Sequence, residues 1–108
     1  MSERPTTLGD LSELVRAKNA GPFWLTLDVF LRDAAAYRRA TEAQVVTPDS
    51  VARAYRVPAQ SVRVFELPDL QVIKVSFPRA VSQGSIHDRD MHSGQQHVPL
   101  ANLPVLDG

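Results

Sequence analysis

Apolar and polar residues alternate most regularly between positions 23 and 31. Phe23, Leu25, Leu27, Val29 and Leu31 occupy every second position of this stretch. A two-residue period predicts a strand with one face in the core. Asp28 lies on its other face, and edge exposure is the simplest explanation for a charge there. A buried Asp28 would instead need a cationic partner such as Arg16 or Lys18.

Three stretches have the spacing of helices. Leu8, Leu11, Leu14 and Val15 predict a helix that begins near residue 8, and Asn19-Ala20-Gly21-Pro22 would end it. A second helix is expected over 34–43, with Asp33 as its N-cap. A third is expected over 48–56, because Thr47 can cap it and Pro48 suits the first helical position.

The second half of the chain predicts a β-hairpin followed by a long loop. Strands are expected over Ser61–Leu67 and Leu70–Phe77, joined by a turn at Pro68-Asp69. Residues 78–97 have no sustained period and are expected to form a loop. The mildly apolar stretch Val98–Leu106 predicts a short edge strand.

These elements predict the domain organisation and the fold class. Residues 1–7 are expected to be a disordered lead, and 8–108 a single domain. The order of helix, strand, two helices, hairpin and last strand predicts an α+β fold. Its sheet would be mostly antiparallel, with helices on one face, in the ferredoxin-like style.

Composition excludes several functional classes. The chain has 108 residues, with 12 basic and 12 acidic side chains and no cysteine. Without a basic excess we expect no nucleic-acid partner, and without cysteine there are no disulfides or thiol nucleophiles. No apolar run approaches the roughly 20 residues that cross a bilayer, so we expect no membrane partner. The polar N-terminus lacks a signal core, and a cytoplasmic location is expected.

All three histidines, His87, His92 and His97, lie in one polar stretch that also contains Asp88 and Asp90. A His–Asp pair is suited to acid–base catalysis, whereas a solvated loop with incidental histidines is the plainer interpretation. Spacings of five place neighbours on opposite faces of a strand and about 140° apart on a helix, which argues against a metal site. Only a folded loop could gather the three. We assign no metal ligand and no cofactor, and keep a divalent cation as an alternative.

A second polar cluster contains Lys18, Asn19 and Gly21. At a helix end these residues have a structural explanation, a cation against the helix dipole and an amide near the cap. The functional alternative is an anion site that Arg79 could join. Gln95 and Gln96, beside His97, would suit recognition of a carboxylate, an amide or a carbonyl. No nucleophile elbow and no phosphate-binding glycine loop occurs.

The blocks Arg16-Ala-Lys-Asn-Ala-Gly-Pro-Phe23 and Gln95-Gln-His-Val-Pro-Leu100 resemble a family of small bacterial proteins of unknown function. The resemblance covers roughly residues 8–106. Members are associated with, or encoded beside, proteins similar to the acyclic terpene utilisation protein AtuA. A more distant similarity is to the ferredoxin-like C-terminal domain of those AtuA-like proteins. That domain has a lysine near its closing segment where this chain has Gln95 or Gln96, so a role of the lysine is not carried over.

The resemblance implies a small subunit of a two-component enzyme that docks on an AtuA-like larger partner. Organic acids or acyl-CoA thioesters would be the substrates, and hydration, dehydration or a related lyase step the reaction. In this hypothesis His97, His92 and Asp90 are catalytic. The expected substrate-binding residues are Lys18, Asn19, Gly21, Arg79, Ser85, Gln95 and Gln96. The alternatives are a non-catalytic interaction or regulatory module, a free-standing metal-dependent enzyme, and a homo-oligomer.

Overall fold

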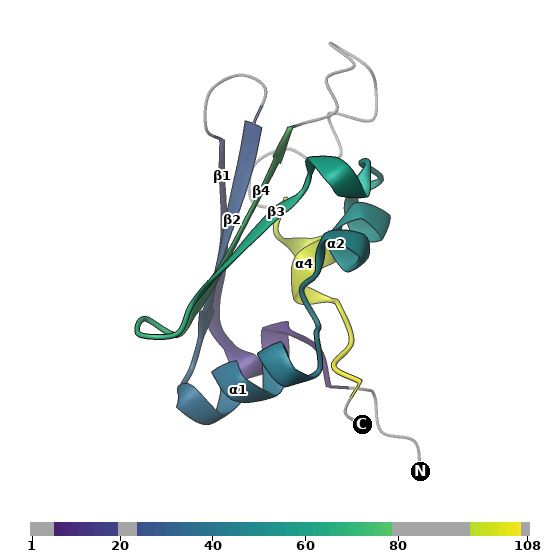
Figure 1. Ribbon diagram of the computed structural model, residues 1–108. Coiled ribbons are helices and arrows are strands. Elements are labelled where there is room, and N and C mark those ends of the chain that lie inside the picture. The colour runs from purple at the N-terminus through teal and green to yellow at the C-terminus, as the bar shows by residue number, and fades with distance from the viewer. Residues whose placement is uncertain (1–5, 20–23, 79–95, 107–108) are drawn as a thin grey trace.

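A computed structural model describes residues 6–19, 24–78 and 96–106 of the chain. Within these residues the chain forms four strands and three α-helices (Figure 1). Their bounds are β1 Ser12–Asn19, β2 Trp24–Leu31, α1 Ala34–Glu42, α2 Pro48–Tyr55, β3 Arg63–Leu67, β4 Val72–Pro78 and α4 Val98–Ala101. Two short 3-10 turns, Gly9–Leu11 and Ala59–Ser61, precede β1 and β3.

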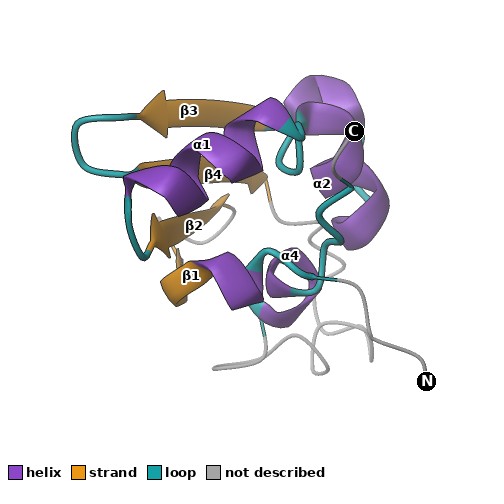
Figure 2. Ribbon diagram, turned by 90° about the horizontal axis from the view of Figure 1, so that it is seen from below, coloured by secondary structure: helices purple, strands orange, loops and turns teal. Residues whose placement is uncertain are grey.

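The strands form one antiparallel sheet in the order β1-β2-β4-β3. All the described helices lie on the same side of it, as Figures 1 and 2 show from two directions. The predicted fold class is confirmed: the chain is α+β, with an antiparallel sheet and helices on one face, consistent with a ferredoxin-like fold. The other side of the sheet is covered by no described helix, and we call it the open face.

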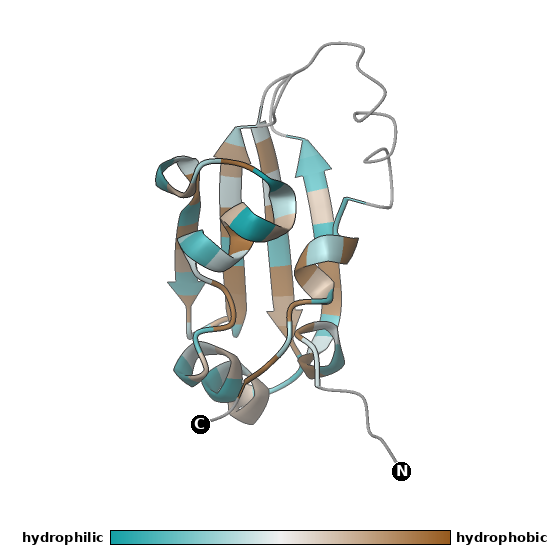
Figure 3. Ribbon diagram, turned by 90° about the vertical axis from the view of Figure 1, so that its right-hand side faces the viewer, coloured by the Kyte–Doolittle hydropathy of each residue, from teal (hydrophilic) through white to brown (hydrophobic). Residues whose placement is uncertain are grey.

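The predicted strand over 23–31 is confirmed as β2, and its alternation places the core. Leu25, Leu27, Val29 and Leu31 are all buried beneath the helices. Figure 3 shows apolar bands on the strands behind the helices. The core also includes Leu8, Leu11, Ala36, Ala40, Val45, Val46, Val51, Val62, Ile73, Val75, Phe77, Leu100 and Val105. No helix of the described residues is long and apolar enough to span a membrane.

The two predicted central helices are confirmed together with their caps. The Asp33 side chain accepts a hydrogen bond from the Ala36 backbone N–H at 2.8 Å. At α2 the Thr47 hydroxyl accepts from the Ser50 N–H at 3.0 Å, and the Ser50 hydroxyl accepts from the Thr47 N–H at 2.9 Å. This reciprocal pair satisfies two backbone donors that a helix start otherwise leaves without partners.

The predicted hairpin is confirmed as β3 and β4. Its connection includes Pro68 and Asp69, as expected, and extends to Gln71, whose φ is 57°. The Leu70 N–H donates to the Leu67 carbonyl at 3.1 Å, and the Gln71 N–H donates to that of Pro68 at 3.2 Å. A proline at the start of such a turn is favoured because its φ is already restricted to the turn value.

The helix predicted from residue 8 is wrong. Leu8 and Leu11 are both buried, but a 3-10 turn over Gly9–Leu11 produces their spacing. The chain then becomes β1, in which Leu14 pairs with Phe30 on the open face and Val15 pairs with Val29 on the covered face. The two residues that seemed to share a helical stripe therefore point to opposite sides of a strand. Pairing with β2 overrides the weak helical spacing.

The edge strand predicted over Val98–Leu106 is also wrong. Val98–Ala101 forms the short helix α4, in which Leu100 is completely buried. Pro99 cannot donate a ladder hydrogen bond but is tolerated in the first turn of a helix.

After α4 the chain makes one isolated bridge, between Pro104 and Thr7. The Leu8 N–H donates a hydrogen bond to the Leu103 carbonyl, and the Val105 N–H donates one to the Thr6 carbonyl, each at 2.8 Å. The expected lead over 1–7 thus remains a prediction for residues 1–5, which lie outside the described residues.

Candidate functional site

Four of the expected site residues fall within the described part of the chain: Lys18, Asn19, Gln96 and His97. The others, Gly21, Arg79, Ser85, Asp90, His92 and Gln95, lie outside it, as do His87 and Asp88, so their assigned roles remain predictions. Lys18 and Asn19 end β1 rather than a helix. The explanation of this pair by a helix dipole is therefore wrong, since the element that ends at these residues is a strand.

Gln96 and His97 immediately precede α4 and differ in exposure. Gln96 is buried, whereas His97 is half-buried and stands at the N-cap position without a side-chain capping bond. The His97 carbonyl accepts a hydrogen bond from the Ala101 N–H at 3.0 Å. Among the described residues, no group of three or more His, Asp or Glu side chains is placed to hold a metal ion.

Tyr55 fixes the position of this segment. Its ring packs against Phe77 of β4, with centroids 5.0 Å apart and planes inclined by 49°. Its hydroxyl donates to the Gln96 carbonyl at 2.8 Å and accepts from the Leu100 N–H at 3.1 Å. Burial raises the pKa of Tyr55 far above its ordinary value, and the Leu100 N–H opposes this only in part. The phenol is therefore a neutral donor that ties the start of α4 to α2.

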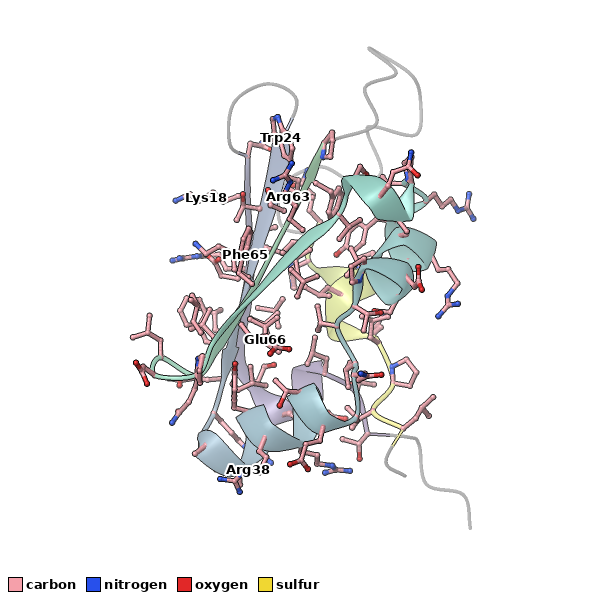
Figure 4. The ribbon with its side chains drawn as sticks, in the orientation of Figure 1. Lys18, Trp24, Arg38, Arg63, Phe65 and Glu66 are labelled. Carbon is pink, nitrogen blue, oxygen red and sulfur yellow. The ribbon has the colours of Figure 1, made fainter. Side chains whose placement is uncertain are left out.

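Lys18 of the first polar cluster and His97 of the second lie on different sides of the sheet. Lys18 extends from the open face, away from the helices (Figure 4), whereas α4 lies on the covered side (Figure 1). Asn19 pairs with Leu25, whose side chain is buried on the covered side. Lys18 and His97 therefore do not converge on one ligand within the described residues.

The open face has three cross-strand rows, read from the pairing register. The apolar row is Leu14, Phe30, Val72 and Leu67; the charged row is Arg16, Asp28, Lys74 and Phe65; and the polar row is Lys18, Thr26, Ser76 and Arg63. Trp24, paired with Pro78, lies beyond the polar row at the end of β2 (Figure 4). Glu13 occupies the irregularity of β1, outside these rows. The face thus changes from an apolar row at one end to a row with two cations, and Trp24 lies beyond that row.

Asp28 is the centre of the charged row and is only 7% exposed. Its Oδ2 lies 3.2 Å from an Arg16 guanidinium nitrogen, and its Oδ1 lies 3.4 Å from Lys74 Nζ. Oδ1 has no hydrogen-bond partner besides this ion pair. The Arg16 guanidinium also lies 5.3 Å from the centroid of the Phe30 ring. Charge attraction on two sides compensates the cost of burying the carboxylate.

This arrangement corrects the expectation that edge exposure explains Asp28. β2 is an internal strand, because it pairs with both β1 and β4. Of the two partners that a buried Asp28 could use, Arg16 is the one that binds it. Lys74, which the sequence did not suggest, takes the place of Lys18. The signal for Lys74 is visible only in the register, which sets it opposite Asp28.

Large apolar side chains remain exposed on the open face. Leu14 is 50% exposed, Phe65 48% and Trp24 38%. Strand alternation in the sequence places Trp24 on the face away from the core, but it gives no reason to expect a functional surface there. The three exposed apolar side chains lie on three different strands, and the sequence did not show how these strands pair.

The comparisons with known proteins give a family and no more. The family model described as a domain of unknown function, DUF4387, matches residues 8–104. No curated protein and no solved structure matches the chain. The match extends over every described strand and helix. The chain therefore belongs to the DUF4387 family of domains of unknown function.

Proposed function

We propose that this chain is a small accessory subunit that docks on a larger protein through its open face. The observation that carries the proposal is the exposure of Leu14, Phe65 and Trp24 on that face. An antiparallel sheet with one solvated face normally alternates apolar inward residues with polar outward ones. A side exposing several large apolar residues is typical of a surface that a partner covers.

The larger partner that we propose is an AtuA-like protein, and the support for this choice is the sequence resemblance described above. The same resemblance supports organic acids or acyl-CoA thioesters as substrates, with a hydratase or lyase reaction. In the shared site His97 would transfer a proton. Tyr55 supports this role indirectly, because it holds the backbone beside His97 in one position. A cytoplasmic location goes with this proposal.

The second candidate is a non-catalytic interaction or regulatory module. The observation that favours it is the separation of Lys18, on the open face, from His97, which precedes α4 on the covered side. Two groups so placed cannot act on one small substrate unless the partner or residues outside the described part complete the site. Under this candidate the histidines contribute to assembly and not to proton transfer.

Co-expression of the chain with an AtuA-like protein tests the proposal. We expect the two to elute together in size-exclusion chromatography with light scattering, at a mass that exceeds that of either alone. A chain that elutes as a monomer and never retains the larger protein would contradict the proposal.

Turnover of acyl-CoA thioesters by the complex then separates the two candidates. If His97 transfers a proton, His97→Ala lowers turnover per complex by about 100-fold or more and leaves association unchanged. If the chain is an interaction module, the same substitution weakens association and leaves turnover per complex unchanged. Arg53→Ala, a change at an exposed position of α2, controls for general effects of substitution on the fold.

A further inference from the structure

We infer that the docking partner presents a surface of aliphatic side chains flanked by carboxylates, which seats on the open face in one orientation. This inference rests on the proposed function, because it describes the surface that the larger partner must offer. It follows from the charges, the exposed apolar groups and their order across the sheet.

The charges on the open face are unbalanced. Its three rows hold four cations, Arg16, Lys18, Arg63 and Lys74, and one carboxylate, Asp28. Asp28 is paired with Arg16 and Lys74. Among the described residues, Lys18 and Arg63 have no ion pair, and both are exposed. The unsatisfied charge of the face is therefore positive and is concentrated in the polar row.

Two of the three large exposed apolar side chains, Leu14 and Phe65, lie away from the polar row, whereas Trp24 lies beyond it. The apolar row ends at Leu14, which is half exposed, and Phe65 extends the apolar surface into the charged row. A partner that satisfies both ends must place aliphatic groups over Leu14 and Phe65 and carboxylates over Lys18 and Arg63. Complementarity of this kind sets orientation and specificity more than raw affinity.

A second copy of the chain does not fit this face. In a face-to-face pair the two-fold axis runs either along the strands or across them. The first case sets the polar row of one copy against the polar row of the other, so that the Lys18 and Arg63 side chains face one another and repel. The second sets the polar row over the apolar row, which removes Lys18 and Arg63 from water above Leu14 and gives them no partner. Both arrangements cost free energy.

Single-stranded nucleic acid is the other ligand that an open sheet with aromatic and basic residues can bind. Three observations weigh against it here. Asp28 lies in the centre of the face, where it would oppose a phosphate, and the chain as a whole has no excess of basic residues. Two of the four cations are also already occupied by Asp28. An acidic, partly apolar protein surface is the better match.

Binding of the full chain to the larger partner, measured by isothermal titration calorimetry, tests the inference. We expect Phe65→Ala, and separately the pair Lys18→Glu with Arg63→Glu, to raise the Kd by about tenfold or more. The matched controls are Leu106→Ala, at an exposed position after α4, and Arg38→Glu, on α1 at the far end of the molecule from Trp24 (Figure 4). Both controls should change the Kd less than twofold. Raising the salt concentration should weaken binding of the wild-type chain and leave the charge-reversed pair less affected.

A measurement on the wild-type chain avoids dependence on how well the variants fold. Amide shifts of isotope-labelled chain on addition of the unlabelled partner should be largest in β1, β2, β3 and β4. Face variants that bind as tightly as the controls, while these shifts still appear, would overturn the inference and leave docking through the open face standing. Binding that leaves these shifts unchanged would overturn the inference together with docking through the open face. If the wild-type chain does not bind the larger partner, both the inference and the proposed function are overturned.

Two further outcomes also overturn the inference. One is a homodimer of the wild-type chain that Phe65→Ala dissociates, which would assign the face to a second copy. The other is binding of a poly-uridine oligonucleotide that is lost in Phe65→Ala and in the charge-reversed pair. That result would identify the face as a base-stacking surface.

Discussion

The Tyr55 hydroxyl lies 2.8 Å from the carbonyl oxygen of Gln96, 41 positions later in the chain. The same hydroxyl accepts from the Leu100 N–H, so one side chain satisfies two backbone groups at the start of α4. Backbone groups buried without a partner are costly, which makes a tyrosine here more than a packing residue. Tyr55 therefore determines where the chain re-enters the fold at Gln96.

Tyr55→Phe tests this role because it keeps the ring against Phe77 and removes only the hydroxyl. We expect the free energy of unfolding to fall by about 1–3 kcal/mol, since two buried backbone groups lose their partner. Chemical denaturation measures the change. Tyr37→Phe is the matched control because the Tyr37 hydroxyl has no hydrogen bond to the described part of the chain. Equal stability of the two variants would show that water replaces the Tyr55 hydroxyl without loss.

Alkaline pH should destabilise the chain through the same group. Burial raises the pKa of Tyr55 in the folded state above its ordinary value of 10.0. The folded state thus holds this proton more tightly than the unfolded state. The resulting stability is complete below pH 10.0 and is lost as the pH rises toward the raised value. The difference in unfolding free energy between wild type and Tyr55→Phe should therefore narrow above pH 10.0. A constant difference through that range would contradict the raised pKa.

In the charged row, we expect removal of the carboxylate to cost less unfolding free energy than removal of its two cations. Asp28→Asn leaves Arg16 and Lys74 without their partner, but both are about half exposed and remain hydrated. We expect a loss of about 1 kcal/mol. Changing Arg16 and Lys74 together to Met leaves a buried carboxylate without compensation, and the loss should reach about 2–3 kcal/mol.

The triple variant completes this test. Adding Asp28→Asn to the double Met variant removes the uncompensated charge, so part of the lost stability should return. Thermal and urea unfolding of the four proteins, with Arg38→Met as a surface control, give the coupling free energy. Strictly additive losses would mean that the three side chains do not interact across the sheet.

Where the sequence carried local signals, it predicted the fold well. Asp33 and Thr47 marked the starts of α1 and α2, and alternation marked β2, because capping and strand burial depend on residues close together in the chain. The predictions failed where contacts between residues far apart in the sequence determine the local structure. Leu14 and Val15 belong to a strand because β2 lies beside them. Leu100 lies in the short helix α4 because its backbone N–H bonds the Tyr55 hydroxyl and its side chain is buried in the core.

The site was predicted less well, for a related reason. The sequence marked Asp28 as an unusual charge and Lys18 as a candidate for an anion site, but the residues that lie beside them in the fold are on other strands. Lys74 reaches Asp28 only through the register of β2 with β4, and Arg63 joins the row of Lys18 only across the whole sheet. A chain pattern identifies which residues share a face of one strand. It cannot show which strands stand side by side.

Trp24 offers a direct reporter of docking on the open face. It is the single tryptophan of the chain, lies at the end of β2 beyond the polar row and is partly exposed. When 5-fluorotryptophan replaces it, the chain has one fluorine signal, and tryptophans of an unlabelled partner do not contribute. Docking on the open face should move that signal and reduce its sensitivity to solvent, because the partner excludes water from the indole. Docking through α1 or the hairpin turn should leave it in place. The Arg38→Glu variant should show the same shift as wild type at saturating partner, whereas the Lys18→Glu and Arg63→Glu pair should need about tenfold more partner to reach it.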